Sequence, residues 1–380
     1  MKENNIPFVK IRKKQGNQFF KFLKRLKDKK SVLNHHYKVE HEDNFIFFPL
    51  NEDSNQLNEL FRRLEKSDFN FQKIYKQGIK NEKFKFKNLE AALQDRIPEP
   101  YFKYIPQSYD IIGSIAIVEI KSLQGQSEEL PSDIKRAISK AITQVNKNVK
   151  SVYEKKSEIK GEYRLRSFNH LYGDQNTETI YKENHCSFKL DIRNTFFTPR
   201  LVYERRRVSN LAYKDSETIV DLFAGVGPFS IQIARKNDVK IYAFDKNPEA
   251  IKFLKDNISL NSLRGTINAY NIDVRDLTDP NNKIGKRLRN QINRIIMNLP
   301  ERSLEFIDIA CSLLKPRGGI LHNYQFAQKS NPLEIAEKGL RATLKKLDWE
   351  IEETILKKIV KPYSPKMDLV VIDAILKKRP

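Results

Sequence analysis

The feature that most constrains this chain is one glycine-containing segment, Asp221-Leu-Phe-Ala-Gly-Val-Gly-Pro-Phe229. The residues that lead into it, 218–221, form a short, apolar, β-branched run, which is typical of a buried parallel strand. Gly225 and Gly227 let the backbone turn tightly and approach a ligand closely. Pro228 suits the first turn of a helix, where a missing N–H costs nothing. The segment therefore predicts a strand, a glycine loop and a helix.

A carboxylate follows this loop at the end of a second apolar run, 239–244, where Asp245 stands. An acidic residue about 20 positions beyond a glycine loop is placed to hold ribose hydroxyls. No Gly-Lys-Ser/Thr follows the loop, and the third glycine of a dinucleotide fingerprint is absent. The segment resembles the first motif of S-adenosylmethionine-dependent methyltransferases, whose donor has ribose and adenine but no pyrophosphate. The alternative is a doubly wound domain in which the glycines only turn the chain.

From about Thr195 the sequence alternates between strand-like and helix-like segments to its end. This spacing predicts an α/β fold: a doubly wound, Rossmann-like and mostly parallel sheet with helices on both faces. The last two strands have no helix between them, so we expect one to run antiparallel at a sheet edge. The basic run around 281–289 indicates a loop. We expect strands at 218–221, 239–244, 266–272, 294–297, 319–324, 349–360 and 369–376, and helices at 228–236, 248–259, 303–315 and 332–346.

Two smaller α+β domains are expected before this one. The predicted domains are 1–95, basic and small; 108–194, in the middle; and 195–380, the Rossmann-like methyltransferase domain. Three prolines between 96 and 108 mark the linker. The first domain should contain a strand at 6–12, a helix at 18–27 and a strand at 44–50. The second should contain strands at 109–120, 152–156, 161–166 and 186–192, a helix at 133–149 and a polar turn at 170–176.

The charge of the chain favours a polyanionic partner. There are 70 Lys and Arg against 48 Asp and Glu, a net charge of +22. Nucleic acid is the first candidate, and a solvated lysine-rich surface is the alternative. Residues 1–40 hold 12 Lys and Arg but 3 Asp and Glu, with aromatic residues between them. Such aromatics can stack on bases, although Phe19, Phe20 and Phe22 also fit the apolar face of a helix.

Several classes of protein are excluded by what the sequence lacks. The two cysteines, Cys186 and Cys311, are far apart and have no metal-ligand spacing, so we expect no disulfide framework, zinc site or iron–sulfur cluster. No apolar run reaches about 18 residues, the minimum for a membrane span. There is no secretory signal at the N-terminus. We expect a soluble, cytoplasmic protein without a metal, and a monomer.

Polar residues stand at the carboxyl ends of the predicted parallel strands, where α/β sheets bind ligands: Asp221, Asp245, Asp273 and Asn298. Asn298-Leu-Pro300 falls where many nucleic-acid amino methyltransferases carry Asn/Asp-Pro-Pro-aromatic. Here Glu301 follows, so no aromatic residue is present to stack on an exocyclic amine, and another target atom is favoured. An Asn amide both donates and accepts, so Asn298 can read a Watson–Crick edge. The alternative is a turn residue before proline.

Further segments complete a specific pattern: Ser108–Ala116, Arg164–Asp174, Thr179–Asn184, Phe197-Thr-Pro-Arg200 with Glu204, and Lys361-Pro-Tyr-Ser-Pro365. Together with the glycine loop and Asn298-Leu-Pro300 they resemble the tRNA (guanine-37-N1) methyltransferase family of archaea and eukaryotes. The resemblance is clear over roughly residues 100–380 and loose over 1–95. It implies a three-domain enzyme that methylates nitrogen-1 of guanine 37, with S-adenosylmethionine as donor, tRNA as partner and no metal.

The resemblance also implies roles for single residues. Glu204 would remove the N1 proton, Arg164 would stabilise charge on the guanine carbonyl oxygen, and Asn298 would fix the base edge. Asp245 would bind the donor's ribose and Asp273 its adenine. The alternatives are an ion pair of Glu204 with the arginines that follow it, and a surface phosphate contact for Arg164. The expected donor site is Phe196, Arg200, Asp221, Phe223, Gly225, Val226, Gly227, Pro228, Asp245, Lys246, Asp273, Val274 and Asn298.

Three other functions compete with this one. Aminocarboxypropyl transferases of wybutosine synthesis share the donor and much of the architecture, although the glycine loop and Asn298-Leu-Pro300 favour methyl transfer. A bifunctional methyltransferase would also act on carbon-7 of the tricyclic guanosine derivative. A non-catalytic RNA-binding protein would share the basic charge, but the set Glu204, Asp221, Asp245 and Asn298 argues against it.

Overall fold

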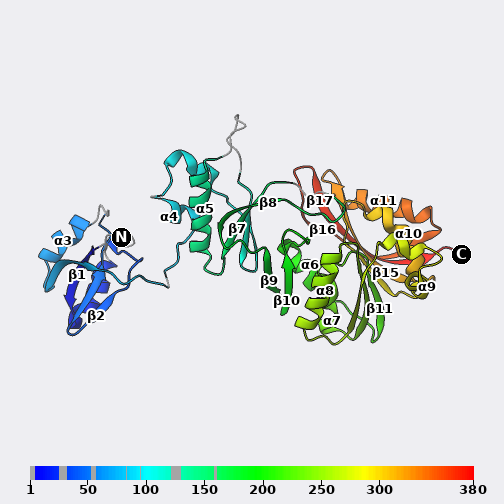
Figure 1. The fold of residues 1–380 in the computed structure, drawn as a ribbon, viewed down its shortest axis with the longest axis horizontal. Coiled ribbons are helices and arrows are strands. Elements are labelled where there is room, and N and C mark those ends of the chain that lie inside the picture. Colours follow the sequence, from blue (N-terminus) through cyan, green and yellow to red (C-terminus); the bar gives the residue numbers. More distant parts are fainter. Residues whose placement is uncertain are drawn as a thin grey trace. The chain divides into compact units, whose positions relative to one another are not determined.

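The computed structural model describes residues 5–24, 32–52, 57–82, 84–94, 96–120, 130–157 and 161–380. The chain divides into two compact units, residues 1–87 and 88–380, which are coloured from blue to red along the chain in Figure 1. None of the described helices is long and apolar enough to cross a membrane.

The N-terminal unit is an antiparallel sheet covered by helices. Phe19 is fully buried in its core, whereas Phe20 is 44% exposed, so packing accounts for the first of these aromatics. The predicted strands at 6–12 and 44–50 are present, and residues 25–27 of the predicted helix lie outside the described part. The sheet has the order β2-β3-β1-β4, and the elements are β1 (Asn5–Arg12), α1 (Gly16–Leu23), β2 (Glu40–Glu42), β3 (Phe45–Pro49), α3 (Leu57–Glu65) and β4 (Phe71–Gln77).

The first part of the second unit is a four-stranded sheet of order β5-β6-β7-β8. The strand expected at 109–120 is instead a hairpin, because Gly113 turns the chain with φ +59°. The predicted strand at 161–166 is wrong too, since Arg164 has φ +57°. The polar segment expected as a turn forms β8, which pairs with β7. The elements are α4 (Leu89–Leu93), η2 (Glu99–Tyr104), β5 (Asp110–Ile112), β6 (Ile115–Val118), α5 (Ser132–Val145), β7 (Ser151–Lys155) and β8 (Phe168–Gly173).

A separate hairpin of β9 (Glu178–Glu183) and β10 (Cys186–Asp191) leads to η3 (Pro199–Leu201) and α6 (Val202–Ser209). Asn184 and His185 form its two-residue turn with φ of 46° and 64°. Two successive positive φ values match the twist of the flanking strands.

The rest of the chain forms a seven-stranded sheet of order β13-β12-β11-β14-β15-β17-β16. The antiparallel strand is β17, but it lies between β15 and β16 and not at the edge as expected. A short helix, α9, occupies part of the predicted basic loop. The elements are β11 (Glu217–Asp221), α7 (Pro228–Lys236), β12 (Val239–Asp245), α8 (Pro248–Leu260), β13 (Thr266–Asn271), η4 (Val274–Thr278), α9 (Lys283–Leu288), β14 (Arg294–Met297), η5 (Ser303–Phe306), α10 (Ile307–Leu313), β15 (Gly319–Gln328), α11 (Pro332–Lys345), β16 (Trp349–Pro362) and β17 (Met367–Lys378).

Helices cover both faces of this sheet (Figure 1): α7 and α8 pack on one apolar layer, and α10 and α11 on the other. The first layer also contains Ile112, Ile115, Ile117 and Tyr153 from the four-stranded sheet. The two sheets of residues 88–380 therefore share a core. In this sheet β12 lies on one side of β11 and β14 on the other, so the strand order reverses at β11. Such a reversal opens a crevice at the carboxyl ends of the strands.

Candidate active site

The glycine loop joins β11 to α7 at this crevice. Gly225 and Gly227 have φ of +54° and +88°, a region that favours glycine. A Cβ on Gly227 would meet Leu254 at 2.3 Å, whereas one on Gly225 would meet nothing closer than a backbone oxygen of Phe196 at 3.9 Å. Gly227 thus packs against the protein, and Gly225 faces open space.

Asp245 is tied directly to this loop. Its Oδ2 accepts the Gly225 N–H at 2.8 Å, and its Oδ1 accepts the Asn247 N–H at 2.8 Å. Burial raises the pKa of the Asp245 carboxyl above its ordinary value. Each carboxylate oxygen keeps a lone pair beyond these bonds, so Asp245 can still accept hydrogen bonds from a ligand's hydroxyls.

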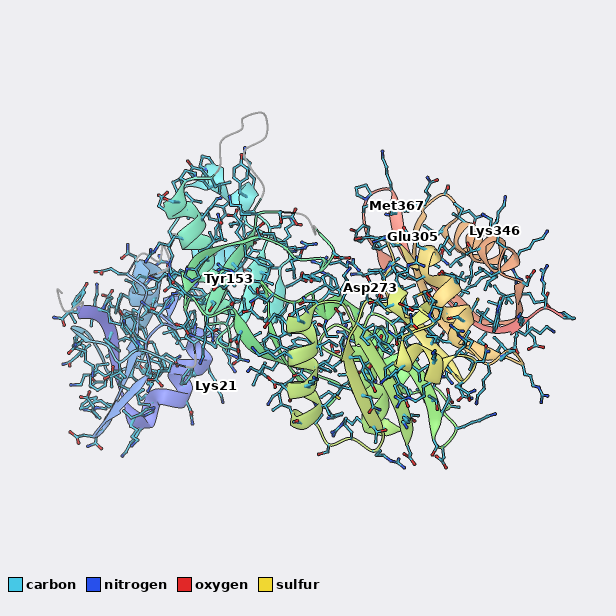
Figure 2. The ribbon with its side chains drawn as sticks, turned by 45° about the vertical axis from the view of Figure 1, so that its right-hand side comes forward. Lys21, Tyr153, Asp273, Glu305, Lys346 and Met367 are labelled. Carbon is cyan, nitrogen blue, oxygen red and sulfur yellow. The ribbon has the colours of Figure 1, made fainter. Side chains whose placement is uncertain are left out.

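A cavity of about 200 Å³, here called the loop cavity, lies beside the glycine loop. Asp273, which follows β13 and caps η4, borders it and is labelled in Figure 2. Although burial would raise the pKa of Asp273, hydrogen bonds from the Arg275 backbone and the Lys246 ammonium lower it. Eight of the expected donor-site residues line this cavity: Phe196, Phe223, Gly225, Asp245, Lys246, Asp273, Val274 and Asn298.

A second cavity of about 300 Å³, here called the basic cavity, adjoins the first. Five cationic side chains line it: Lys155, Arg164, Arg166, Arg200 and Lys361. The carboxylates Asp110 and Glu119 line it as well, and Asp110 pairs with Arg200 and Lys155. The rings of Phe326 and Tyr363 stack at 3.8 Å between centroids in its wall. Cations that bind phosphates and aromatic rings that stack on bases suit a nucleotide.

The two cavities meet at three side chains that line both: Arg164, Phe196 and Asn298. The Arg164 guanidinium lies 4.6 Å from the centre of the Phe196 ring. Its Nη2 donates to Oε1 of Glu301 at 3.2 Å, while its Nε is buried without a hydrogen-bond partner among the described residues. Burial lowers the pKa of Arg164, and Glu301 opposes that shift. A cation whose Nε–H is unpaired within the described part of the chain therefore lies where a group could pass from one cavity to the other.

Three protein-family models match successive parts of this chain. Residues 179–352 match the TRM5/TYW2 methyltransferase domain, 89–177 the TYW2 N-terminal domain, and 9–58 the tRNA methyltransferase 5 N-terminal domain. The tRNA (guanine(37)-N(1))-methyltransferase Trm5b of Methanocaldococcus jannaschii is 33% identical over 98% of this chain and 99% of its own length. The chain belongs to the TRM5/TYW2 methyltransferase family.

Other members of the TRM5/TYW2 family extend this comparison. Trm5b of Pyrococcus abyssi is 38% identical over 73% of this chain and 77% of its own length. The tRNA(Phe) (4-demethylwyosine(37)-C(7)) aminocarboxypropyltransferase of Pyrococcus horikoshii is 34% identical over 78% of this chain and 97% of its own. Among solved structures, the complex of aTrm5 and tRNALeu has a TM-score of 0.70 at 31% identity and covers 97% of this chain and 99% of that one. P. horikoshii TYW2 in complex with MeSAdo has a TM-score of 0.62 at 29% identity, over 76% and 98%.

Five of the expected donor-site residues do not line the loop cavity. Arg200 lines the basic cavity, where its Nε donates to Asp110 at 2.8 Å. Asp221 is buried behind the loop and accepts the Ser230 hydroxyl at 2.7 Å, and burial raises its pKa to about 7. Val226 and Gly227 in the loop, and Pro228 at the start of α7, lie outside the lining of both cavities. Their contacts with a donor remain predictions.

Glu204 lines neither cavity. Its Oε1 accepts from Arg207 at 2.5 Å and from the Tyr324 hydroxyl at 3.0 Å, and its Oε2 pairs with Lys358 at 2.7 Å. Burial would raise the pKa of Glu204, but these hydrogen bonds lower it. The ion pair with a following arginine, considered as an alternative from the sequence, is therefore present.

Sequence reasoning missed several residues of the two cavities. Glu162 lines the loop cavity and pairs with Lys246, which also lines it, and Tyr363 lines the basic cavity. Tyr363 stands in the Lys-Pro-Tyr-Ser-Pro segment, which was a usable signal, whereas nothing local marks Glu162. Among the described residues, no cluster of His, Cys, Asp or Glu could hold a metal ion.

Proposed function

We propose that this protein transfers a methyl group from S-adenosylmethionine to nitrogen-1 of guanine 37 in tRNA. The observation that carries the proposal is the junction of the two cavities at Arg164, Phe196 and Asn298. A donor in one cavity and a base in the other would meet there. The Trm5b relatives support guanine 37 as the target.

The residues of the loop cavity fit the donor. Asp245 would hold the ribose hydroxyls and Asp273 the adenine amine, while Phe223 and Val274 offer apolar contact with the adenine ring. The open space in front of Gly225 leaves room for the ligand to approach the backbone. When bound, the donor supplies a methyl group carried on a sulfonium sulfur.

The chemistry at the base requires a proton to leave. Nitrogen-1 of guanine is protonated at neutral pH and is a poor nucleophile until that proton is removed. As the N1 proton leaves, negative charge moves toward the carbonyl oxygen, and it is neutralised as the bond from methyl carbon to sulfur breaks and the bond to N1 forms. Arg164 would donate to that oxygen in a site where burial strengthens the interaction. Asn298 would orient the base edge.

Glu204 is proposed as the proton acceptor on the strength of the motif Phe-Thr-Pro-Arg-Leu-Val-Tyr-Glu204 alone. Its two ion pairs, with Arg207 and Lys358, would have to rearrange before it could accept a proton from a bound base. The lowered pKa also makes it a weak base in the present arrangement.

We further propose tRNA binding by both units. The cations of the basic cavity suit phosphates near the target base, and a relative has been crystallised with tRNALeu. In the N-terminal unit the Lys10 ammonium lies 4.0 Å from the centre of the Phe45 ring, which places a cation beside an aromatic ring, the two kinds of group that bind phosphates and bases. Lys76 of the same unit instead pairs with two carboxylates, Glu40 and Glu42. We keep the three-domain division, the monomeric state and the cytoplasmic location as parts of the proposal.

Aminocarboxypropyl transfer is the second candidate, because relatives with that activity are 34% and 32% identical to this chain. The match of residues 9–58 to the tRNA methyltransferase 5 N-terminal domain favours methyl transfer. The experiment is to incubate the protein with donor and unmodified tRNA and to weigh the modified nucleoside. A gain of one methyl group on unmodified tRNA supports the proposal, and an unchanged nucleoside would refute it. A tRNA that carries the tricyclic intermediate tests both carbon-7 alternatives, because a methyl group adds far less mass than an aminocarboxypropyl group. A protein that fails to bind donor in calorimetry would be a non-catalytic RNA-binding protein.

A further inference from the structure

Glu301 comes directly after Asn298-Leu-Pro300 and pairs with Arg164, which lines both cavities, although Glu301 itself lines neither. The preceding residue, Pro300, lines the basic cavity, and the following residue, Arg302, lines the loop cavity. Its Oε1 lies 3.2 Å from Nη2 of Arg164. The Glu301 side chain is 38% exposed, whereas that of Arg164 is 14% exposed. A partly exposed carboxylate is therefore held beside the buried cation.

We propose that Glu301 accepts a hydrogen bond from the 2-amino group of the target guanine, so that Arg164 and Glu301 together select guanine. This inference rests on the proposed function. The Watson–Crick edge of guanine presents an acceptor, O6, and two donors, N1–H and the 2-amino group. Arg164 offers donors only and Glu301, when ionised, acceptors only. The pair is complementary to that edge.

The ion pair does not have to break for both contacts to form. Each terminal guanidinium nitrogen carries two hydrogens, so Nη2 of Arg164 can donate to Glu301 and to O6 at once. The buried Nε is a further donor without a partner among the described residues. Adenine has an amine where guanine has O6 and an acceptor where guanine has N1–H. With adenine, Arg164 would therefore face a donor, and Glu301 would face the hydrogen on carbon-2 without a hydrogen-bond partner. Buried polar groups left unpaired reject a ligand strongly.

The experiment uses tRNA transcripts that carry guanosine or inosine at position 37, because inosine keeps O6 and N1–H and lacks only the 2-amino group. Single-turnover methylation rates at saturating donor are measured for the intact protein and for Glu301→Gln. We expect the intact protein to favour guanosine by about tenfold or more, the usual scale for a hydrogen bond to a charged group. Glu301→Gln should slow the methylation of the guanosine transcript by a similar factor. It should change the methylation rate of the inosine transcript by less than about twofold.

Equal slowing of both substrates would overturn the proposal, since Glu301 would then only position Arg164. Unchanged rates on both would overturn it as well. Glu301→Ala should give the same loss of preference, which guards against a new contact made by the amide. Glu352→Gln removes an exposed carboxylate on β16 that pairs with Lys377, and it should leave both rates unchanged. Failure of the intact protein to methylate either transcript would refute the proposed function, and it would do so separately from the role of Glu301.

Discussion

The guanidinium of Arg164 lies over the ring of Phe196, 4.6 Å from its centre. The two residues come from separate segments, one in a turn before β8 and the other before α6. Arg164 reaches this position from a backbone with φ +57°, in a turn closed by its own N–H to the Gly161 carbonyl at 3.2 Å. Stacking and burial hold the planar group at the junction of the cavities, so its position depends on shape as well as on charge.

Replacing Arg164 with Lys should therefore slow methylation although it keeps the positive charge. Lysine has neither the planar fork nor the stack on Phe196, so the charge that develops on the carbonyl oxygen would lose its positioned donor. We expect the single-turnover rate to fall about 10²–10³-fold, the scale for removing one such hydrogen-bond donor. The affinity for S-adenosylmethionine should change little. Arg287→Lys is the matched control, because Arg287 also stacks on a ring, that of Tyr242 at 5.1 Å, away from both cavities. A near-normal rate for Arg164→Lys would show that charge alone suffices.

Apart from η4 and α9, the strands and helices from 217 to 345 lie close to their predicted positions, because their apolar runs end at prolines, glycines and carboxylates with local meaning. Pro228 and Pro248 both begin helices, and Asp221 and Asp245 both end strands. These features depend on neighbours along the chain.

What the sequence could not reveal depends on contacts between distant segments. The polar run 168–173 becomes a strand only because β7 pairs with it, and β17 inserts beside β15 because of pairing across the sheet. Glu204 meets Tyr324 and Lys358, which are more than a hundred residues away in the chain. No local pattern predicts such partners.

A comparison of two carboxylates tests the role of Glu204. Glu204 and Asp373 both pair with Arg207, so Glu204→Gln and Asp373→Asn should each lower the free energy of unfolding, by about 3 kcal/mol. If Glu204 is the base, only Glu204→Gln should slow the chemical step by about 10²–10⁴-fold. Single-turnover rates and urea unfolding of both variants give the answer. Similar rates for the two variants would assign Glu204 to stability alone.

The pH dependence of stability tests the burial of Asp221. Its pKa is raised to about 7 in the folded protein, above a value of about 3.9 when unfolded. The folded state then binds the extra proton, so the stabilisation that Asp221 provides is complete below about pH 4 and is lost as the pH rises through about 7. Asp221→Asn cannot titrate. Relative to the intact protein, it should gain about 2–3 kcal/mol of unfolding free energy between about pH 5 and about pH 8, measured by urea unfolding. A difference that stays constant with pH would contradict this.

Removal of residues 1–87 tests the N-terminal unit. Donor binding should persist, because the loop cavity is built from residues 162–306. Binding of whole tRNA should weaken and lose part of its salt dependence, since fewer phosphates are neutralised. An anticodon stem-loop should be affected much less. Equal binding of both RNAs before and after removal, with the same salt slope, would mean that the basic charge of this unit is only a solvated surface.

The central claim, that the junction at Arg164, Phe196 and Asn298 brings a donor to nitrogen-1 of guanine, has one direct test. Two tRNA transcripts that differ only at position 37, guanine or adenine, are incubated with the protein and S-adenosylmethionine. Their nucleosides are then compared with authentic 1-methylguanosine by chromatography and mass spectrometry. We predict 1-methylguanosine from the first transcript and no methylated product from the second. Equal methylation of both, or a methyl group on another atom of guanine, would contradict the account.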